Sequence, residues 1–276
     1  MASDSEEGRR LRPELLCEAS RPQLREYAPN VAVLPWGATE AHGSHLPYTT
    51  DNVQAEAFAA RAAAIARERG ARPVVLPVVP FGSNAQQLDQ VATCHLSVST
   101  VLGVLRDVVR SMTTQGIDRL LIVNSHGGNE FRPFVRDLQF EFKALIVVAD
   151  FWRMRPELRR EVFDVPGDHA DESEASLLLH LRPDLVRMAD AGRGERLPFR
   201  IEGLSQPGVW TPRPWAAIHP DTGSGDPRMA SADKGRRYFE GVSEAIAEVI
   251  VGLSRALPGD VPYFGGEYGD EPAGLH

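Results

Sequence analysis

Acidic residues and histidines are concentrated in the segment GATEAHGSHLPYTTD, residues 37–51. Glu40 and His42 stand two positions apart, a spacing that points both side chains the same way in extended backbone. Each charged residue also has a purely structural interpretation, because Asp51 could cap a following helix and His45 could bond to loop backbone. Taken together, the four side chains favour a metal site over a solvated loop.

A second polar segment, NSHGGNE, covers residues 124–130. His126 is followed there by Gly127 and Gly128, which allow a sharp turn or a close approach of the backbone to a ligand. A turn with a hydrogen-bonded histidine is the alternative. His126 therefore gains weight as a ligand mainly from its pairing with the first segment.

The third segment, GDHADESEAS, covers residues 167–176 and opens a helix that runs to Pro183. Acidic residues in a first helical turn also complement the helix dipole, so surface capping explains part of this pattern. Glu174 stands beside apolar positions of the helix and is expected to point inwards. A buried carboxylate requires a partner, and a metal ion would supply one.

The combined donors are carboxylate oxygen and imidazole nitrogen, without thiolate: Glu40, His42, Asp51, His126 and Glu174. Such donors suit Zn²⁺, Mn²⁺ or Fe²⁺. They exceed the three protein ligands of a usual catalytic zinc, but two divalent ions bridged by an aspartate would use them all. A metal pair converts a bridging water to hydroxide and polarises a carbonyl, so hydrolysis is the expected chemistry. The sequence has no nucleophile elbow, P-loop or dinucleotide fingerprint.

Four short apolar runs are predicted to be strands buried on both faces of a parallel sheet: Val31–Gly37, Val74–Gly82, Leu120–Gly128 and Ala144–Trp152. Helical patterns separate them at Asn52–Arg69, around Val101–Met112 with Ser99 or Thr100 as the cap, and at Pro133–Phe142. The alternation predicts an α/β fold with right-handed crossovers. Ligand sites in such sheets form at the carboxyl ends of the strands, where the first two polar segments lie.

Composition indicates a soluble globular protein. The net charge of -8 argues against nucleic acid or an anionic membrane as the main partner. The longest apolar run is too short to span a membrane, the first residues lack the apolar core of a secretion signal, and the two cysteines fit a reducing compartment. We therefore expect a cytoplasmic protein with one domain over residues 13–262 and flexible tails at 1–12 and 263–276.

The three polar segments resemble the signature of the creatininase (creatinine amidohydrolase) family. That signature runs Glu-x-His-Gly-x-His-Leu-Pro, Asp, Asn-Gly-His-Gly-Gly-Asn and His-Ala-x-x-x-Glu-Thr-Ser. Its parts stand here, in the same order, as EAHGSHLP with Asp51, NSHGGN and HADESEAS. The resemblance spans roughly residues 30–253 and implies a three-layer αβα fold with a mostly parallel sheet. It also implies a homohexamer built as a trimer of dimers.

Carried over residue by residue, the resemblance implies an amidohydrolase with two divalent ions, Zn²⁺ or Mn²⁺ with Fe²⁺ as a further candidate. Glu40, Asp51 and His126 would bind one ion, and His42, Asp51 and Glu174 the other, with Asp51 as the bridge. His169 matches the histidine that moves a proton between water and the leaving nitrogen, and Glu174 is counted with it in the catalytic machinery. His45 is assigned to fixing the loop.

The sequence departs from the family pattern at three positions. Creatininases proper carry a metal-binding Glu two residues after the second-motif histidine, where this chain has Gly128. The ligand role therefore passes to Glu174, and creatinine is not the expected substrate. Ser125 replaces a Gly and Ala175 replaces a Thr, and both changes are tolerable.

The expected reaction is hydrolysis of a C–N bond in a small cyclic amide, lactam or formamide. The alternative within the fold is ring opening of an oxidised (keto) sugar or cyclitol, and a non-catalytic metal-binding scaffold is a third hypothesis that His169 argues against. Aromatic residues in a Pro-rich stretch at 208–219 and the amide-rich Phe81–Gln90 could line the pocket. The candidate substrate contacts are Gly127, Gly128, Trp152, Trp210 and Trp215.

Overall fold

A computed structural model describes residues 12–256. Two expected parts of the chain lie outside this range: the flexible tails at 1–12 (apart from Arg12) and 263–276, and the end of the domain at 257–262. The strands are β1 (Val31–Trp36), β2 (Pro73–Val75), β3 (Arg119–Asn124) and β4 (Leu145–Asp150). The helices are α1 (Arg21–Tyr27), α2 (Thr50–Glu68), α3 (Val98–Thr114), α4 (Arg132–Phe142), α5 (Pro156–Val162), α6 (Glu172–Leu181), α7 (Trp215–Ile218) and α8 (Ala232–Arg255). Short 3-10 turns are η1 (Ala85–Gln87), η2 (Phe151–Arg153), η3 (Pro183–Leu185), η4 (Met188–Asp190), η5 (Glu202–Ser205) and η6 (Pro227–Met229).

The four strands form one parallel sheet in the order β2-β1-β3-β4. The register pairs Trp36 with Asn124 and Asn124 with Asp150, so the carboxyl ends of β1, β3 and β4 lie side by side. The chain segments that leave these three ends therefore meet at one edge of the sheet. This confirms the predicted α/β class and explains how polar segments far apart in the sequence come together.

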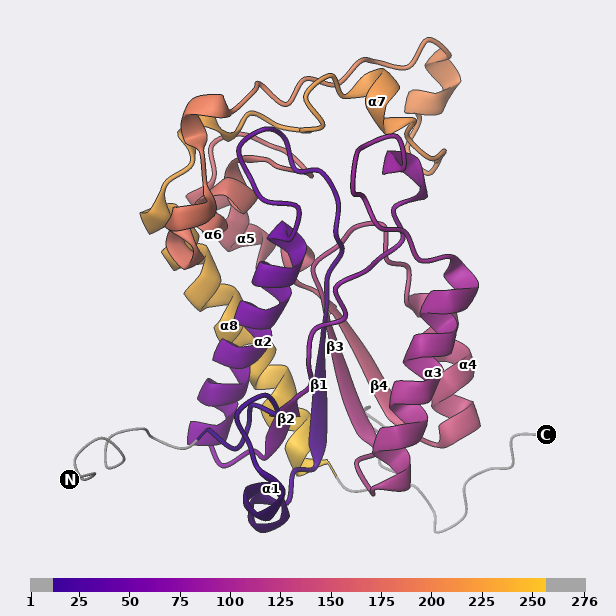
Figure 1. Cartoon of the computed structure of the whole chain (residues 1–276), viewed down its shortest axis with the longest axis vertical. Helices are drawn as coiled ribbons and strands as arrows, with labels where there is room; N and C mark the ends of the chain where they lie inside the picture. The colour runs from indigo at the N-terminus through magenta and orange to yellow at the C-terminus, as the bar shows by residue number, and fades with distance from the viewer. Residues whose placement is uncertain (1–11, 257–276) are drawn as a thin grey trace.

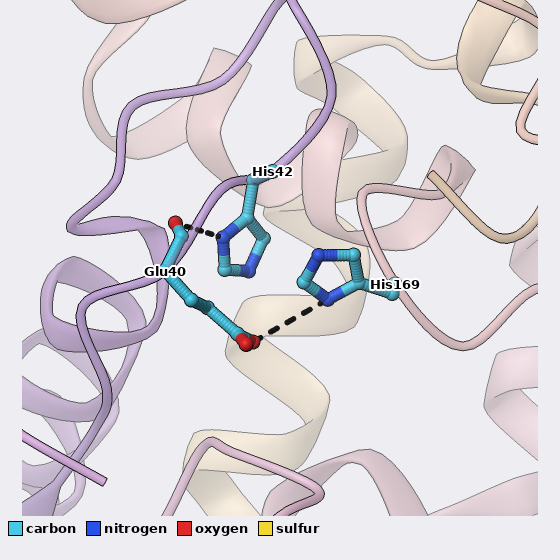
Figure 2. A group of neighbouring side chains, drawn as sticks. All are labelled: Glu40, His42 and His169. Atoms are coloured by element: carbon cyan, nitrogen blue, oxygen red, sulfur yellow. Dashed lines mark hydrogen bonds and ion pairs between the residues drawn. The ribbon is translucent and has the colours of Figure 1, made fainter. Parts of the chain in front are cut away.

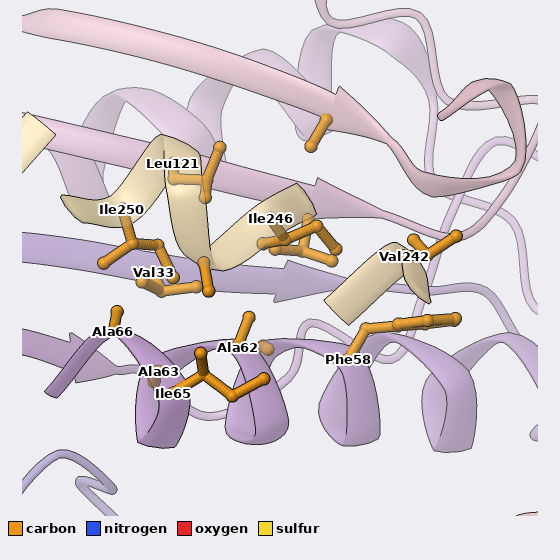
Figure 3. Packing of buried hydrophobic residues seen from close by; sticks show 14 of the residues in the cluster. Val33, Phe58, Ala62, Ala63, Ile65, Ala66, Leu121, Val242, Ile246 and Ile250 are labelled. Atoms are coloured by element: carbon orange, nitrogen blue, oxygen red, sulfur yellow. The ribbon is translucent and has the colours of Figure 1, made fainter. Parts of the chain in front are cut away.

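Helices cover both faces of the sheet, with α2 and α8 on one side and α3 and α4 on the other (Figure 1). Alternate residues of each strand serve the two layers: Val33 and Leu121 pack with α2 and α8, whereas Leu34 and Ile122 pack with α3 and α4. Figure 3 shows the first layer, in which small side chains of α2 let Ile246 and Ile250 of α8 approach the sheet. The continuous apolar strand sequences follow from burial on both faces.

The structure corrects several predicted boundaries. The second strand was expected over Val74–Gly82 but extends only over Pro73–Val75. Pro77 and Pro80 lack the backbone N–H that a continued ladder needs, and only single contacts such as Val79 N to the carbonyl of Pro35 prolong the pairing. Helix α2 begins at Thr50, so Asp51 lies in its first turn and is not the N-cap.

Helix α3 was also assigned the wrong cap. Ser97, not Ser99 or Thr100, accepts the hydrogen bond from the backbone of Thr100 at the start of the helix. No helix within residues 12–256 is both long enough and apolar enough to cross a membrane.

Candidate metal centre

The polar loop that follows β1 supplies Glu40 and His42, and the first turn of α2 supplies Asp51. All three side chains are buried. The loop after β3 brings His126 beside them. The segment before α6 brings His169, and the first turn of α6 brings Glu174. The predicted ligands from three distant segments therefore meet at the carboxyl edge of the sheet.

Two groups of possible metal ligands share one carboxylate. Glu40, Asp51 and His126 form one group, and His42, Asp51 and Glu174 form the other, with ligand atoms in each group within 4.8 Å of one another. Asp51 directs its two oxygens to different groups: Oδ2 lies 3.2 Å from His126 Nδ1 and Oδ1 lies 3.2 Å from His42 Nε2. Asp51 therefore lies between the two groups of possible ligands and faces both.

Glu40 lies between His126 of the first group and His169. Its Oε1 lies 3.1 Å from His126 Nδ1 and 3.6 Å from His169 Nδ1. Glu40, His42 and His169 also form a third possible ligand group (Figure 2). The His42 and His169 rings lie 4.1 Å apart between centroids, so the three residues line one small space.

Each of the three histidines has one ring nitrogen against a backbone carbonyl, which can only accept a hydrogen bond. His42 Nδ1 lies 3.1 Å from the carbonyl of Glu40, His126 Nε2 lies 3.3 Å from that of Ser83, and His169 Nε2 lies 2.8 Å from that of Ala41. The anchored nitrogen must carry the hydrogen, so the opposite nitrogen of each ring directs a lone pair at the carboxylates. Lone pairs facing carboxylates require a cation or a proton between them, so the donor set fits divalent metal ions.

Burial and the close neighbouring charges shift the pKa values of the site residues. Burial alone would lower the pKa of His42, but the carboxylates of Asp51 and Glu174 outweigh it and raise that pKa to about 10. Burial raises the pKa of Glu174 to about 8. Burial and the neighbouring His42 lower the pKa of His169 to about 4, which leaves its imidazole neutral at pH 7.

Surrounding residues hold the ligands in place. Gln87 in η1 donates to Oε2 of Glu40 over 2.6 Å, Ser125 donates its hydroxyl to the backbone carbonyl of Asp51 over 2.7 Å, and Ala170 N–H donates to Glu174 Oε2 over 2.5 Å. Sequence reasoning pointed to the amide-rich 81–90 stretch, but it did not single out Gln87 or Ser125. The neighbouring His45 is buried and has no hydrogen-bond partner for either ring nitrogen among the described residues.

A pocket of about 500 Å³ opens over these ligands. Gly127, Trp152 and Trp210 of the candidate substrate contacts line it, together with Arg153, Arg159 and Arg213. Gly128 and Trp215 do not. Trp215 is buried and packs edge-on against His169, with ring centroids 5.0 Å apart.

Gly128 lies where no side chain fits. A Cβ at this position would come within 2.4 Å of both His126 Nε2 and the carbonyl oxygen of Ser83. The neighbouring Gly127 would meet nothing within 4 Å. Gly128 therefore allows the close contact that holds His126, and a glutamate ligand there would displace it.

Comparison with known proteins identifies the family. The profile of the creatininase family, described as creatinine amidohydrolase, matches residues 17–250. The chain therefore belongs to the creatininase family of hydrolases. A mycofactocin precursor peptide peptidase of Mycobacterium tuberculosis (strain ATCC 25618 / H37Rv) is 30% identical over 243 residues, which cover 81% of this chain and 85% of the relative.

Further relatives extend the comparison. The creatinine amidohydrolase of Pseudomonas putida is 27% identical over 247 residues, 80% of this chain and 88% of its own. The crystal structure of a Bacteroides fragilis protein assigned as a creatinine amidohydrolase superposes with a TM-score of 0.83 at 37% identity, over 89% of this chain and 98% of that one. A creatininase structure with manganese has a TM-score of 0.72 at 23% identity over 88% of this chain and 99% of its own, which shows a shared fold.

Proposed function

We propose that this protein is an amidohydrolase that works with two divalent ions, Zn²⁺ or Mn²⁺ with Fe²⁺ as a further candidate. Glu40, Asp51 and His126 would hold one ion, and His42, Asp51 and Glu174 the other. The proposal rests on the position of Asp51, whose two carboxylate oxygens lie 3.2 Å from His126 and 3.2 Å from His42. Such ions, when bound, supply an activated water and polarise the carbonyl under attack.

His169 is assigned the proton transfer. Its Nε2 is held by the carbonyl of Ala41 at 2.8 Å, so its Nδ1 is the nitrogen free to accept a proton. That atom faces the space beside Glu40 at 3.6 Å. A neutral imidazole there can take a proton from the attacking water and deliver it to the leaving nitrogen. Glu174 is counted with His169 in the catalytic machinery, and its Oε2 lies 3.7 Å from His42 Nε2.

The bond cleaved would be the C–N bond of an amide in a small cyclic amide, lactam or formamide. A peptide is the second candidate, supported by the name of the mycobacterial relatives and by a second pocket beside the first. We do not expect creatinine to be the substrate. Creatininases proper use a glutamate two residues after the second-motif histidine, and position 128 leaves no room for one.

The test combines metal analysis with His169→Ala. We expect about two ions per chain in the wild type, and the variant should keep them while kcat falls by about 10²–10⁴, the usual contribution of a proton-transfer group. Turnover should be compared on lactams, formamides, short peptides and oxidised inositols, the last group representing ring opening of a keto cyclitol.

Two outcomes would contradict the proposal. Wild-type protein that holds well under one ion per chain, and that added Zn²⁺ or Mn²⁺ does not activate, would exclude a metal-dependent hydrolase. Loss of metal from His169→Ala would make His169 a ligand rather than the proton carrier, as its place in the third ligand group allows.

A further inference from the structure

A second pocket of about 690 Å³ adjoins the metal pocket. Its walls come from η1, from the segment between α6 and α7, and from the end of α7. Arg196, Arg200 and Arg213 line it together with the apolar side chains of Leu197, Phe199 and Ile218. We call it the arginine pocket.

The arginine pocket is positively charged without compensation from its own walls. No aspartate or glutamate is among its lining residues, although the chain as a whole has a net charge of -8. Within residues 12–256, neither Arg196 nor Arg200 forms an ion pair. The guanidinium of Arg196 lies over the ring of Phe199, 5.5 Å from its centroid. Two guanidinium groups without counter-charges beside an apolar wall are suited to an anionic group attached to an apolar body.

Arg213 joins the two pockets, since it lines both. Its guanidinium is fixed by Asp168 at 3.0 Å and lies 4.2 Å from the Trp215 ring centroid. Trp215 in turn packs against His169. A ligand whose reacting amide lies beside His169 would therefore reach the arginine pocket by passing Arg213.

We propose that the arginine pocket binds an anionic group of the substrate at a distance from the amide that is cleaved, and that this group is a carboxylate. Arg196 and Arg200 hold the carboxylate, while Leu197, Phe199 and Ile218 contact the apolar part next to it. The inference rests on the proposed amidohydrolase function and narrows its substrates to elongated amides with a terminal carboxylate, of which a short peptide is the simplest.

The test uses two peptides of one neutral sequence, acetyl-Ala-Ala-Ala-Phe-Ala, with either a free C-terminal carboxylate or a carboxamide. Binding is measured calorimetrically on metal-loaded His169→Ala protein, in which turnover is slow, and kcat and KM are measured on otherwise wild-type protein. The same measurements are repeated with Arg196→Gln/Arg200→Gln added. Arg193→Gln is the matched control, because Arg193 is an exposed arginine of the same segment that lines neither pocket.

We expect the carboxylate form to bind about tenfold more tightly than the carboxamide, as for a hydrogen-bonded charge pair. This preference should vanish in the double variant and persist in Arg193→Gln. The double substitution should change KM for the carboxylate peptide and leave kcat unchanged. Equal binding of the two peptides, or a preference that survives the double substitution, would overturn the proposal. A third peptide, a carboxamide with phosphoserine as its last residue, tests phosphate: tighter binding of this peptide through the same arginines would overturn the assignment to a carboxylate.

The two proposals fail in different ways. If the carboxylate preference depends on Arg196 and Arg200 but neither peptide is hydrolysed, the arginine pocket stands and peptide hydrolysis does not. If both peptides are hydrolysed equally well, amide hydrolysis stands and the arginine pocket is excluded. Circular dichroism of the double variant establishes that a lost preference does not come from unfolding.

Discussion

The three site histidines are each held from behind by a backbone carbonyl. The carbonyl of Ala41 holds His169, that of Ser83 holds His126, and that of Glu40 holds His42. Each carbonyl fixes which ring nitrogen carries the hydrogen, and so which nitrogen faces the carboxylates. No side chain is needed for this orientation. The backbone itself therefore prepares the imidazoles to bind a cation or to accept a proton.

For His126 this orientation depends on a neighbouring glycine. We predict that Gly128→Ala destabilises the protein by about 1–3 kcal/mol, the usual cost of overpacking, because the new Cβ would press on His126 and Ser83 at 2.4 Å. The same change at Gly127 meets nothing within 4 Å and should cost less than about 0.5 kcal/mol. Denaturant unfolding of both variants checks this, and equal losses would refute the special role of position 128.

The sequence could indicate the ligands but not all of their supports. Glu40 and His42 are two residues apart after an apolar strand, which is a local pattern that can be read directly. The contact between Gln87 and Glu40 joins positions 47 apart in sequence, and no local pattern predicts it. The stretches 81–90 and 208–219 were predicted to line the pocket, and residues of both line the arginine pocket. Arg196 and Arg200 were not predicted, since their segment meets η1 only in the fold.

At the scale of elements, the η1 turn connects the two pockets. Gln87 at its end donates to Glu40, whereas Ala85 and Gln86 line the arginine pocket. The turn is held by Asn84, whose side-chain amide donates to the backbone carbonyl of Cys94 at 2.9 Å. One short element thus supports a metal-ligand candidate and shapes the neighbouring wall.

We predict that Gln87→Ala weakens metal binding about 10–100-fold, the usual effect of losing a hydrogen bond to a ligand. The carboxylate of Glu40 would lose the donor that fixes Oε2 and would turn away from His126. Competition with a zinc chelator measures the affinity directly, without an assay of turnover. Gln90→Ala, in the same loop but with only a 3.4 Å contact to Asp89, is the control and should leave the affinity unchanged.

Elements with a continuous apolar run were predictable, and elements punctuated by proline were not. β1 and β4 lie within their predicted ranges, β3 begins one residue before its predicted start at Leu120, and prolines shorten β2. Helix α8 was not predicted, although Val242, Ile246 and Ile250 recur at a spacing of four residues and are all buried. This periodicity is present in the sequence and is typical of an amphipathic helix.

At the scale of the whole molecule, the function depends on a register that no single segment contains. Trp36, Asn124 and Asp150 are aligned across three strands, and this alignment carries the loops after β1 and β3 to the same edge. The α/β class could be predicted from the alternation of strands and helices. The walls of the two pockets could not, because part of each comes from the long excursion between α6 and α8 that lies over the edge of the sheet (Figure 1).

Large apolar side chains are also exposed outside the pockets. Val91, Ile201 and Val98 are 84%, 66% and 63% exposed. Exposed large apolar side chains are typical of surfaces that another chain covers. They are consistent with the homohexamer that the resemblance to creatininases implies, which stays a prediction.

We predict that the protein in solution has about six times the 30.3 kDa mass of one chain when measured by light scattering after size exclusion. Val91→Asp/Ile201→Asp should lower that mass, because burying two carboxylates at an apolar contact costs several kcal/mol per charge. Asp89→Asn, a change at a residue that is already polar and exposed, should leave the assembly intact. A wild-type protein that runs as a monomer at tens of micromolar would contradict the hexamer, and an assembly unaffected by the paired aspartates would place its contacts elsewhere on the surface.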